Sequence, residues 1–263
     1  MRNSLLLCLL VICLSGSPAY AKEIIRVGGY PFAPFVYRHG PAYDGVTLAL
    51  IQALNQIQDE FELSFTPISS TRRLQGFDLH RFDLILFENP RWGWEGRDLE
   101  FIPLPFSDGD IMITLQSAED TTALFQHPDK YSLIAVQGFH YGFANYQNDP
   151  DYLRQHYDIL LVKDNESSLQ ALLRKRGKIA LITYSYLMTR LSQQPELQRQ
   201  ITLAPSYDTR YALGALLRAS HPHLHRTQLE KWLNQLEQDG SLARIWERYV
   251  PKGYPRVIPP SRQ

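Results

Sequence analysis

A short stretch around residues 88–97 gathers the side chains with the greatest chemical potential. Glu88 ends an apolar run, and the segment that follows it contains Trp92, Trp94 and Arg97. A surface loop rarely carries two tryptophans without burying them. A carboxylate beside aromatic ring faces suits a cation, through charge and through cation–π contact. We predict either that Glu88 and the two tryptophans line a ligand pocket or that they fold back on the neighbouring core.

Histidines are the other residues that could do chemistry. His140 could act as a general base, but a lone histidine in a loop is more often a hydrogen-bonding or exposed residue. His221, His223 and His225 alternate around Pro222; such spacing can bind a metal on a strand, yet a loop between helices favours a solvated cluster. Gly-x-Ser-x-Gly, a phosphate loop and His-Glu-x-x-His are all absent from the sequence. We therefore expect binding without catalysis, and no metal or cofactor.

The elements that must position these residues come in two similar blocks. Each block alternates apolar strands with amphipathic helices, a pattern that predicts a parallel sheet with right-handed crossovers. The predicted strands are residues 24–27, 61–65 and 83–87 in the first block, and 133–136, 159–162 and 179–183 in the second. The predicted helices are 47–57 and 74–79 in the first block, and a stretch through 146–153 and 165–177 in the second. Extended segments at 110–115 and 211–217 would connect the blocks, so we expect two α/β lobes with a hinge and a cleft between them.

The last part of the chain predicts two packed helices. Leu229, Trp232, Leu233 and Leu236 recur at helical spacing, and so do Leu242, Ile245, Trp246 and Tyr249 after an interruption at Asp239-Gly240-Ser241. Gly240 can take the left-handed conformation that ends the first helix. The hydroxyl of Ser241 is expected to cap the second.

From Leu233 the tail reads Leu-x-x-Leu-x-x-Asp-Gly-Ser-Leu-x-x-Ile-Trp-x-x-Tyr. This pattern resembles the end of the family 3 solute-binding proteins, which are the receptors of polar amino-acid ABC transporters. The resemblance implies an α/β, two-lobed periplasmic binding protein of type II, each lobe a mostly parallel sheet flanked by helices, with a hinged cleft between them. On this basis residues 22–112 form the first part of lobe one and 113–210 form lobe two. Residues 211–263 supply the hinge return and the C-terminal helices on lobe one.

The resemblance also places residues in the cleft. The run Tyr30-Pro31-Phe32-Ala33-Pro34-Phe35 is similar to the family's first ligand loop, and Gln137-Gly138-Phe139-His140 is similar to the turn that opens lobe two. Tyr184 and Ser185 stand at the end of the stretch that carries the family's ammonium-binding aspartate. By strict spacing the family's carboxylate-binding arginine falls on Glu95; only a shifted loop would let Arg97 or Arg91 replace it. The ligand-binding residues implied are therefore Tyr30, Phe32, Phe35, Glu88, Trp92, Trp94, Arg97, Phe139, His140, Tyr184 and Ser185. Because a serine cannot neutralise an ammonium, the usual amino-acid contacts are incomplete in this chain.

Composition and the N-terminal residues set the wider expectations. The first 21 residues read as a cleavable signal peptide that ends at Ala19-Tyr20-Ala21, which implies a periplasmic protein. Both cysteines, Cys8 and Cys13, lie in that segment. The 27 basic and 27 acidic residues balance without a basic stripe, so a nucleic-acid partner is not expected. We expect a monomer that passes a small polar solute, an amino acid or a related amine or organic acid, to an ABC permease. A dehydratase acting on cyclohexadienyl acids, with Glu88 or His140 as acid or base, and a ligand sensor for a membrane kinase are the alternatives.

Overall fold

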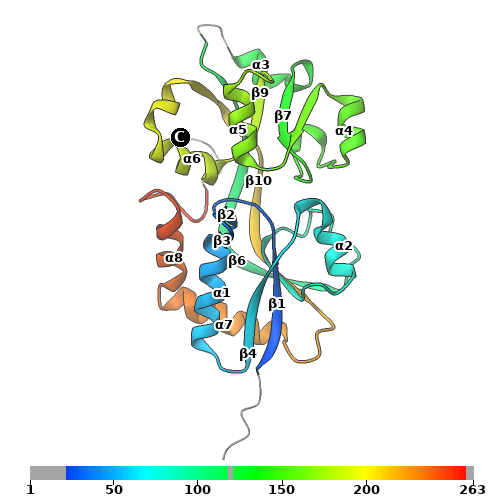
Figure 1. The fold of residues 1–263 in the computed structure, drawn as a ribbon, viewed down its shortest axis with the longest axis vertical. Coiled ribbons are helices and arrows are strands. Elements are labelled where there is room, and N and C mark those ends of the chain that lie inside the picture. The colour runs from blue at the N-terminus through cyan, green and yellow to red at the C-terminus, as the bar shows by residue number, and fades with distance from the viewer. Residues whose placement is uncertain (1–21, 118–120, 259–263) are drawn as a thin grey trace, which may run out of the picture.

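Two long antiparallel strands organise a mixed eight-stranded sheet in the computed structural model, which describes residues 22–117 and 121–258. The strand order is β4-β1-β5-β10-β6-β9-β7-β8. The long strands are β6 (Leu99–Leu115) and β10 (Ile201–Arg218), and both run through the two lobes seen in Figure 1. Each lobe has its own cluster of buried apolar side chains, so each has its own core.

Lobe one contains the parallel strands nearest the start of the chain. Ile25 of β1 lies opposite Leu63 of β4, and Val27 of β1 lies opposite Leu84 of β5. The elements of this lobe are β1 (Glu23–Gly29), β2 (Tyr37–His39), β3 (Ala42–Asp44), α1 (Val46–Ile57), β4 (Phe61–Pro67), η1 (Ser70–Arg72), α2 (Arg73–Asp78) and β5 (Leu84–Glu88). Helices α7 (Arg226–Gln238) and α8 (Ser241–Tyr249) pack beside α1, which returns the C-terminal part of the chain to lobe one (Figure 1).

Lobe two repeats the parallel arrangement around β7. Leu133 of β7 lies opposite both Ile159 of β8 and Ile179 of β9. The elements of this lobe are α3 (Thr122–Gln126), η2 (Pro128–Lys130), β7 (Leu133–Val136), η3 (Gly142–Ala144), α4 (Pro150–His156), β8 (Ile159–Val162), α5 (Asn165–Leu173), β9 (Ile179–Thr183), α6 (Tyr184–Gln193) and η4 (Pro195–Arg199). The β-α-β pattern predicted for both blocks is thus confirmed, and the predicted fold class with it.

Several local expectations are corrected by the structure. Helix α8 begins at Ser241 after Gly240 in the left-handed conformation, as expected, but the Ser241 hydroxyl does not cap it; instead the Asp239 carboxylate accepts a hydrogen bond from the Ser241 amide at 2.8 Å. Tyr146 lies outside α4 with a positive φ of 64°. The predicted lobe boundaries at 112/113 and 210/211 fall inside β6 and β10, and they stay a prediction because both strands are continuous there.

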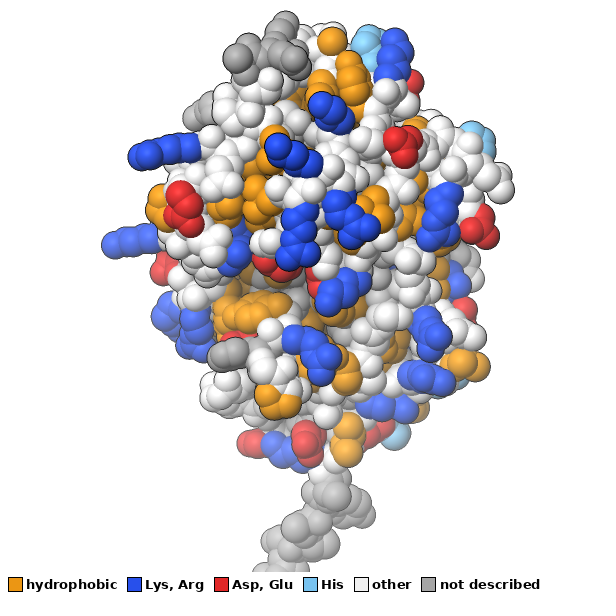
Figure 2. All heavy atoms as spheres, turned by 45° about the horizontal axis from the view of Figure 1, so that its top comes forward, with side chains coloured by type: hydrophobic (Ala, Val, Ile, Leu, Met, Phe, Trp, Pro, Cys, Tyr) orange, Lys and Arg blue, Asp and Glu red, His pale blue; other side chains and the backbone are white. Residues whose placement is uncertain are grey.

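Charged side chains are scattered over one face of the molecule (Figure 2). On the face drawn in Figure 2, lysines and arginines are spread among fewer acidic side chains. Within residues 22–117 and 121–258 no helix is long and apolar enough to cross a membrane. The predicted signal peptide lies outside the described residues.

Candidate functional site

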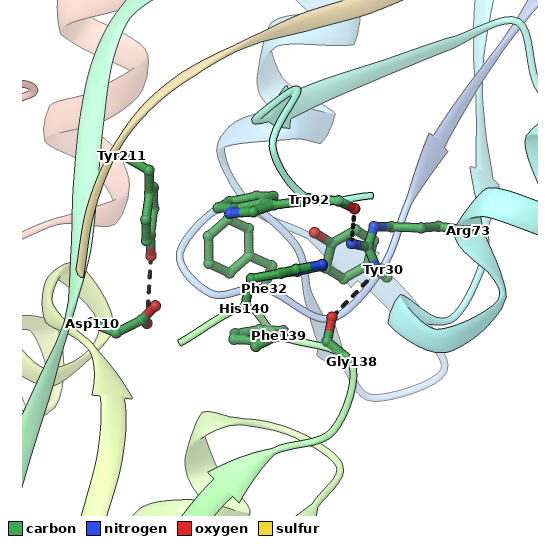
Figure 3. A pocket seen from close by; sticks show the side chains of 9 residues that line it. All are labelled: Tyr30, Phe32, Arg73, Trp92, Asp110, Gly138, Phe139, His140 and Tyr211. Carbon is green, nitrogen blue, oxygen red and sulfur yellow. Dashed lines mark hydrogen bonds between the residues drawn. The ribbon is translucent and has the colours of Figure 1, made fainter. Parts of the chain in front are cut away.

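A small pocket lies where the two lobes meet beside the long strands (Figure 3). Its free volume is about 10 Å³, which is close to the smallest space that holds one water molecule. Its walls come from both lobes: Tyr30, Phe32, Arg73, Trp92, Asp110, Gly138, Phe139, His140 and Tyr211. The lobes are therefore nearly closed on one another here.

Aromatic rings fill the centre of the pocket. Phe32, which follows β1, has its ring centroid 5.9 Å from that of Trp92, 5.5 Å from that of Phe139 and 6.5 Å from that of Tyr211. Trp92 and Tyr211 lie 4.9 Å apart at a steep angle. Phe139 comes from lobe two, so the Phe32–Phe139 contact joins the lobes through apolar surface.

One end of the pocket is formed by Arg73, the first residue of α2, which is 2% exposed. Its guanidinium donates to the carbonyl oxygens of Ser70, Trp92 (2.8 Å) and Gly138 (3.4 Å). The hydroxyl of Ser70 donates to the carbonyl oxygen of Gln137 at 3.1 Å. Since Gln137 and Gly138 belong to lobe two, these hydrogen bonds hold the start of α2 against the turn after β7.

Behind Arg73 lies Glu88, which is fully buried at the end of β5. Its carboxylate accepts hydrogen bonds from the Tyr30 hydroxyl and from Trp94 Nε1 (2.6 Å), and it lies 3.6 Å from Arg73 Nε. Burial raises the pKa of Glu88, while Arg73 and the two donors act against that rise. Two donors and an adjacent guanidinium directed at one carboxylate favour its ionised form. Glu88 and Arg73 therefore form a buried ion pair that supports the pocket wall without Glu88 lining it.

The opposite end of the pocket is formed by Asp110 of β6, as Figure 3 shows. One of its carboxylate oxygens accepts from the Thr183 hydroxyl at 3.2 Å and from the Tyr211 hydroxyl at 3.5 Å. Burial raises the pKa of Asp110 well above its ordinary value, and the nearby Asp208 and Asp108 raise it further. This end of the pocket is thus acidic in character.

His140 lies in the pocket wall as a neutral side chain. Burial, together with the positive charge of Arg73, lowers the pKa of His140 to about 3. A histidine with so low a pKa is a weak proton acceptor near neutral pH. Its place in the pocket fits a contact residue better than a general base.

The structure brings only some of the predicted site residues together. Five line the pocket: Tyr30, Phe32, Trp92, Phe139 and His140. The others lie elsewhere: Glu88 and Trp94 behind the wall, Phe35 in the core against Phe87, Arg97 in an ion pair with Asp78, Tyr184 against Tyr207, and Ser185 bonded to Asp108. Ligand contact by any of the eleven stays a prediction.

Three residues that we did not predict also line the pocket: Arg73, Asp110 and Tyr211. Arg73 sits in a run of two arginines that reads as a solvated helix start, and Asp110 was expected only as part of a connecting strand. Asp110 could have been found from its position within an otherwise apolar strand. A carboxylate buried there costs free energy unless a partner compensates for it. The expectation of a solvated histidine cluster is wrong for His221, which is buried and whose Nδ1 accepts from the amides of His223 and Leu224. In the described part of the chain no group of three or more His, Cys, Asp or Glu side chains could hold a metal ion.

Comparison with known proteins gives the fold. No family model and no curated protein matches the sequence. A lysine-bound structure of a putative ABC-transporter binding component from Wolinella succinogenes superposes with a TM-score of 0.70 at 16% identity, covering 89% of this chain and 98% of that one. The chain has the fold of the type II periplasmic binding proteins.

Two further structures show the same architecture. The GluR0 ligand-binding core with L-glutamate has a TM-score of 0.65 at 17% identity and covers 88% of this chain and 99% of its own. The ancestral amino-acid-binding protein AncCDT-1, a precursor of cyclohexadienyl dehydratase, has a TM-score of 0.63 at 16% identity and covers 87% and 95%. Binding proteins of this fold use a cleft between the lobes, which is where the pocket lies in this chain.

Proposed function

We propose that the protein is a receptor that captures a small polar solute between its lobes and performs no bond chemistry. The observation that carries this proposal is the pocket between the lobes, which has aromatic walls, a buried arginine at one end and a buried aspartate at the other. A few well-placed polar groups within an apolar wall are typical of small-molecule sites.

Lobe movement is part of the proposal. A free volume of about 10 Å³ is too small for an amino acid or an amine. A solute would enter when the lobes separate, which breaks the Arg73–Gly138 and Ser70–Gln137 hydrogen bonds and parts Phe32 from Phe139. Closure on the solute would then compensate for these lost contacts.

The proposed setting follows from the sequence and from the fold. We propose that the chain is exported to the periplasm, acts as a monomer and delivers its solute to the permease of an ABC importer. The buried Glu88, already engaged by two donors and the Arg73 guanidinium, and the neutral His140 support binding over the dehydratase alternative, because neither is poised to move a proton.

A thermal-shift screen of the purified protein against amino acids, amines, organic acids and sugars tests the proposal. A ligand present at 100 times its dissociation constant stabilises a protein by about 2.7 kcal/mol. For a chain of this length that corresponds to a rise of roughly 5–10 °C in the unfolding midpoint. If no class of solute raises the midpoint, the receptor proposal is wrong.

A matched pair of variants locates the site. Phe139→Ala removes a partly buried ring of lobe two that lines the pocket, and Tyr157→Ala removes a partly buried ring of lobe two that packs on Phe143 outside it. We expect the first variant to weaken the ligand-induced shift and the second to preserve it.

A further inference from the structure

Asp110 differs from the other buried acidic side chains around the pocket in what its carboxylate contacts. It is 3% exposed, and within residues 22–117 and 121–258 it accepts hydrogen bonds only from the neutral hydroxyls of Thr183 and Tyr211. Among the ion pairs formed by the described residues, none involves Asp110. A buried carboxylate without a cationic partner is costly unless a partner arrives or the group takes up a proton.

The neighbouring charges are already accounted for. Glu88 and Arg73 are paired at 3.6 Å. The carboxylate of Asp108 accepts from the side chain and amide of Ser185 and from the amide of Gly109. Asp208 accepts from the amides of Gly142 and Phe143 at 2.7 Å and 2.9 Å. Of these four described carboxylates, Asp110 accepts a hydrogen bond neither from a cation nor from a backbone amide.

Ring faces lie beside that carboxylate. Phe32, Trp92 and Tyr211 are 5%, 8% and 7% exposed, and their rings meet within 6.5 Å of one another. Figure 3 shows Tyr211 directly beside Asp110, with Phe32 between Asp110 and the Arg73 end. A desolvated cation gains from both the carboxylate and the negative faces of such rings.

We propose that the solute is an organic molecule of net positive charge, and that its quaternary ammonium or side-chain ammonium group lies against Asp110. Phe32, Trp92 and Tyr211 surround that group when the lobes close. This inference rests on the proposed receptor function and names its ligand class. It assigns the charge recognition to the long strand β6, whereas the sequence predicted it for Glu88.

Isothermal titration calorimetry of the purified protein tests the inference with four probes: choline, L-lysine, L-glutamine and L-glutamate. We expect choline or L-lysine to bind and L-glutamine and L-glutamate to bind at least tenfold more weakly. Asp110→Asn should weaken binding of the cation by about 30-fold or more, because truncating one partner of a buried charge pair has an effect of this size. Asp83→Asn removes a buried carboxylate far from the pocket, where it pairs with Arg26, and should leave the affinity unchanged.

Trp92→Leu provides an independent test should Asp110→Asn fail to fold. It keeps the carboxylate and removes one ring, so we expect about a fivefold loss for choline. Preferential binding of L-glutamate or L-glutamine would overturn the cation assignment while leaving the receptor function intact. Unchanged cation affinity in either variant would do the same. Failure of every solute in both this panel and the wider screen would instead overturn the receptor function, and the cation assignment with it.

Discussion

Replacing Glu88 with glutamine should destabilise the protein by about 4 kcal/mol. The side chain is fully buried, and the amide of glutamine can keep both hydrogen bonds, accepting from Trp94 and donating to the Tyr30 hydroxyl. The change therefore removes the negative charge and leaves Arg73 unpaired. At the 3.6 Å separation in the structure, two unit charges in an effective dielectric of 20 attract by about 4–5 kcal/mol. Breaking one side of a buried pair typically costs about 3–5 kcal/mol.

Urea unfolding of the two proteins at neutral pH measures this difference. Asp78→Asn is the control, since the Asp78–Arg97 pair is also made by a carboxylate and an arginine but is half exposed, and its loss should cost less than about 1 kcal/mol. The double variant Glu88→Gln/Arg73→Met should be less destabilised than the sum of its single variants, because each single change leaves a lone buried group. A destabilisation of Glu88→Gln no larger than that of Asp78→Asn would refute the reasoning, and would mean that Glu88 is already protonated in the folded protein.

Three further predictions concern the supports of the pocket. Burial raises the pKa of Asp108 to about 7. Its contribution to stability is therefore full below its unfolded pKa near 4 and is lost as pH rises through 7. Between these two pH values the free energy of unfolding should fall by up to about 1.4 kcal/mol per pH unit, and less steeply in Asp108→Asn. Gly45→Ala would place a Cβ against the carbonyl oxygen of Phe35 at a backbone φ of 127°. It should lower the free energy of unfolding by about 2–3 kcal/mol, as measured in a thermal melt. The control Gly40→Ala, whose surroundings are open, should lower it by about 1 kcal/mol. Ser185→Ala removes the hydrogen bond to Asp108 and should cost about 1–3 kcal/mol by urea unfolding.

The scaffold could be predicted from the sequence because it depends on periodic burial. Leu229, Trp232, Leu233 and Leu236 are all buried on one face of α7, and Leu242, Ile245 and Trp246 on one face of α8, as their spacing predicted. Helix caps were less predictable. At Ser241 the hydroxyl accepts a hydrogen bond from the Arg244 guanidinium at 2.8 Å in place of a backbone amide, and periodicity contains no information about such a choice.

The site was harder to predict because its members meet only through the fold. Arg73 and Glu88 are brought together across two elements, and Asp110 reaches Tyr211 through the antiparallel pairing of β6 with β10. The sequence drew attention to Glu88 and the tryptophans as one group, and Glu88 and Trp94 do bond to each other. The sequence could not show that the Glu88–Trp94 hydrogen bond directs Glu88 away from the pocket, because the direction of this side chain depends on how deeply β5 is buried.

The most direct test of the central claim is a calorimetric titration of the purified protein with the strongest ligand from the solute screen, repeated on Asp110→Asn and Trp92→Leu. The account predicts one ligand per chain, a negative heat-capacity change from closure over the aromatic walls, and weaker binding in both variants. Wild-type affinity in both variants would place the binding site elsewhere and contradict the account.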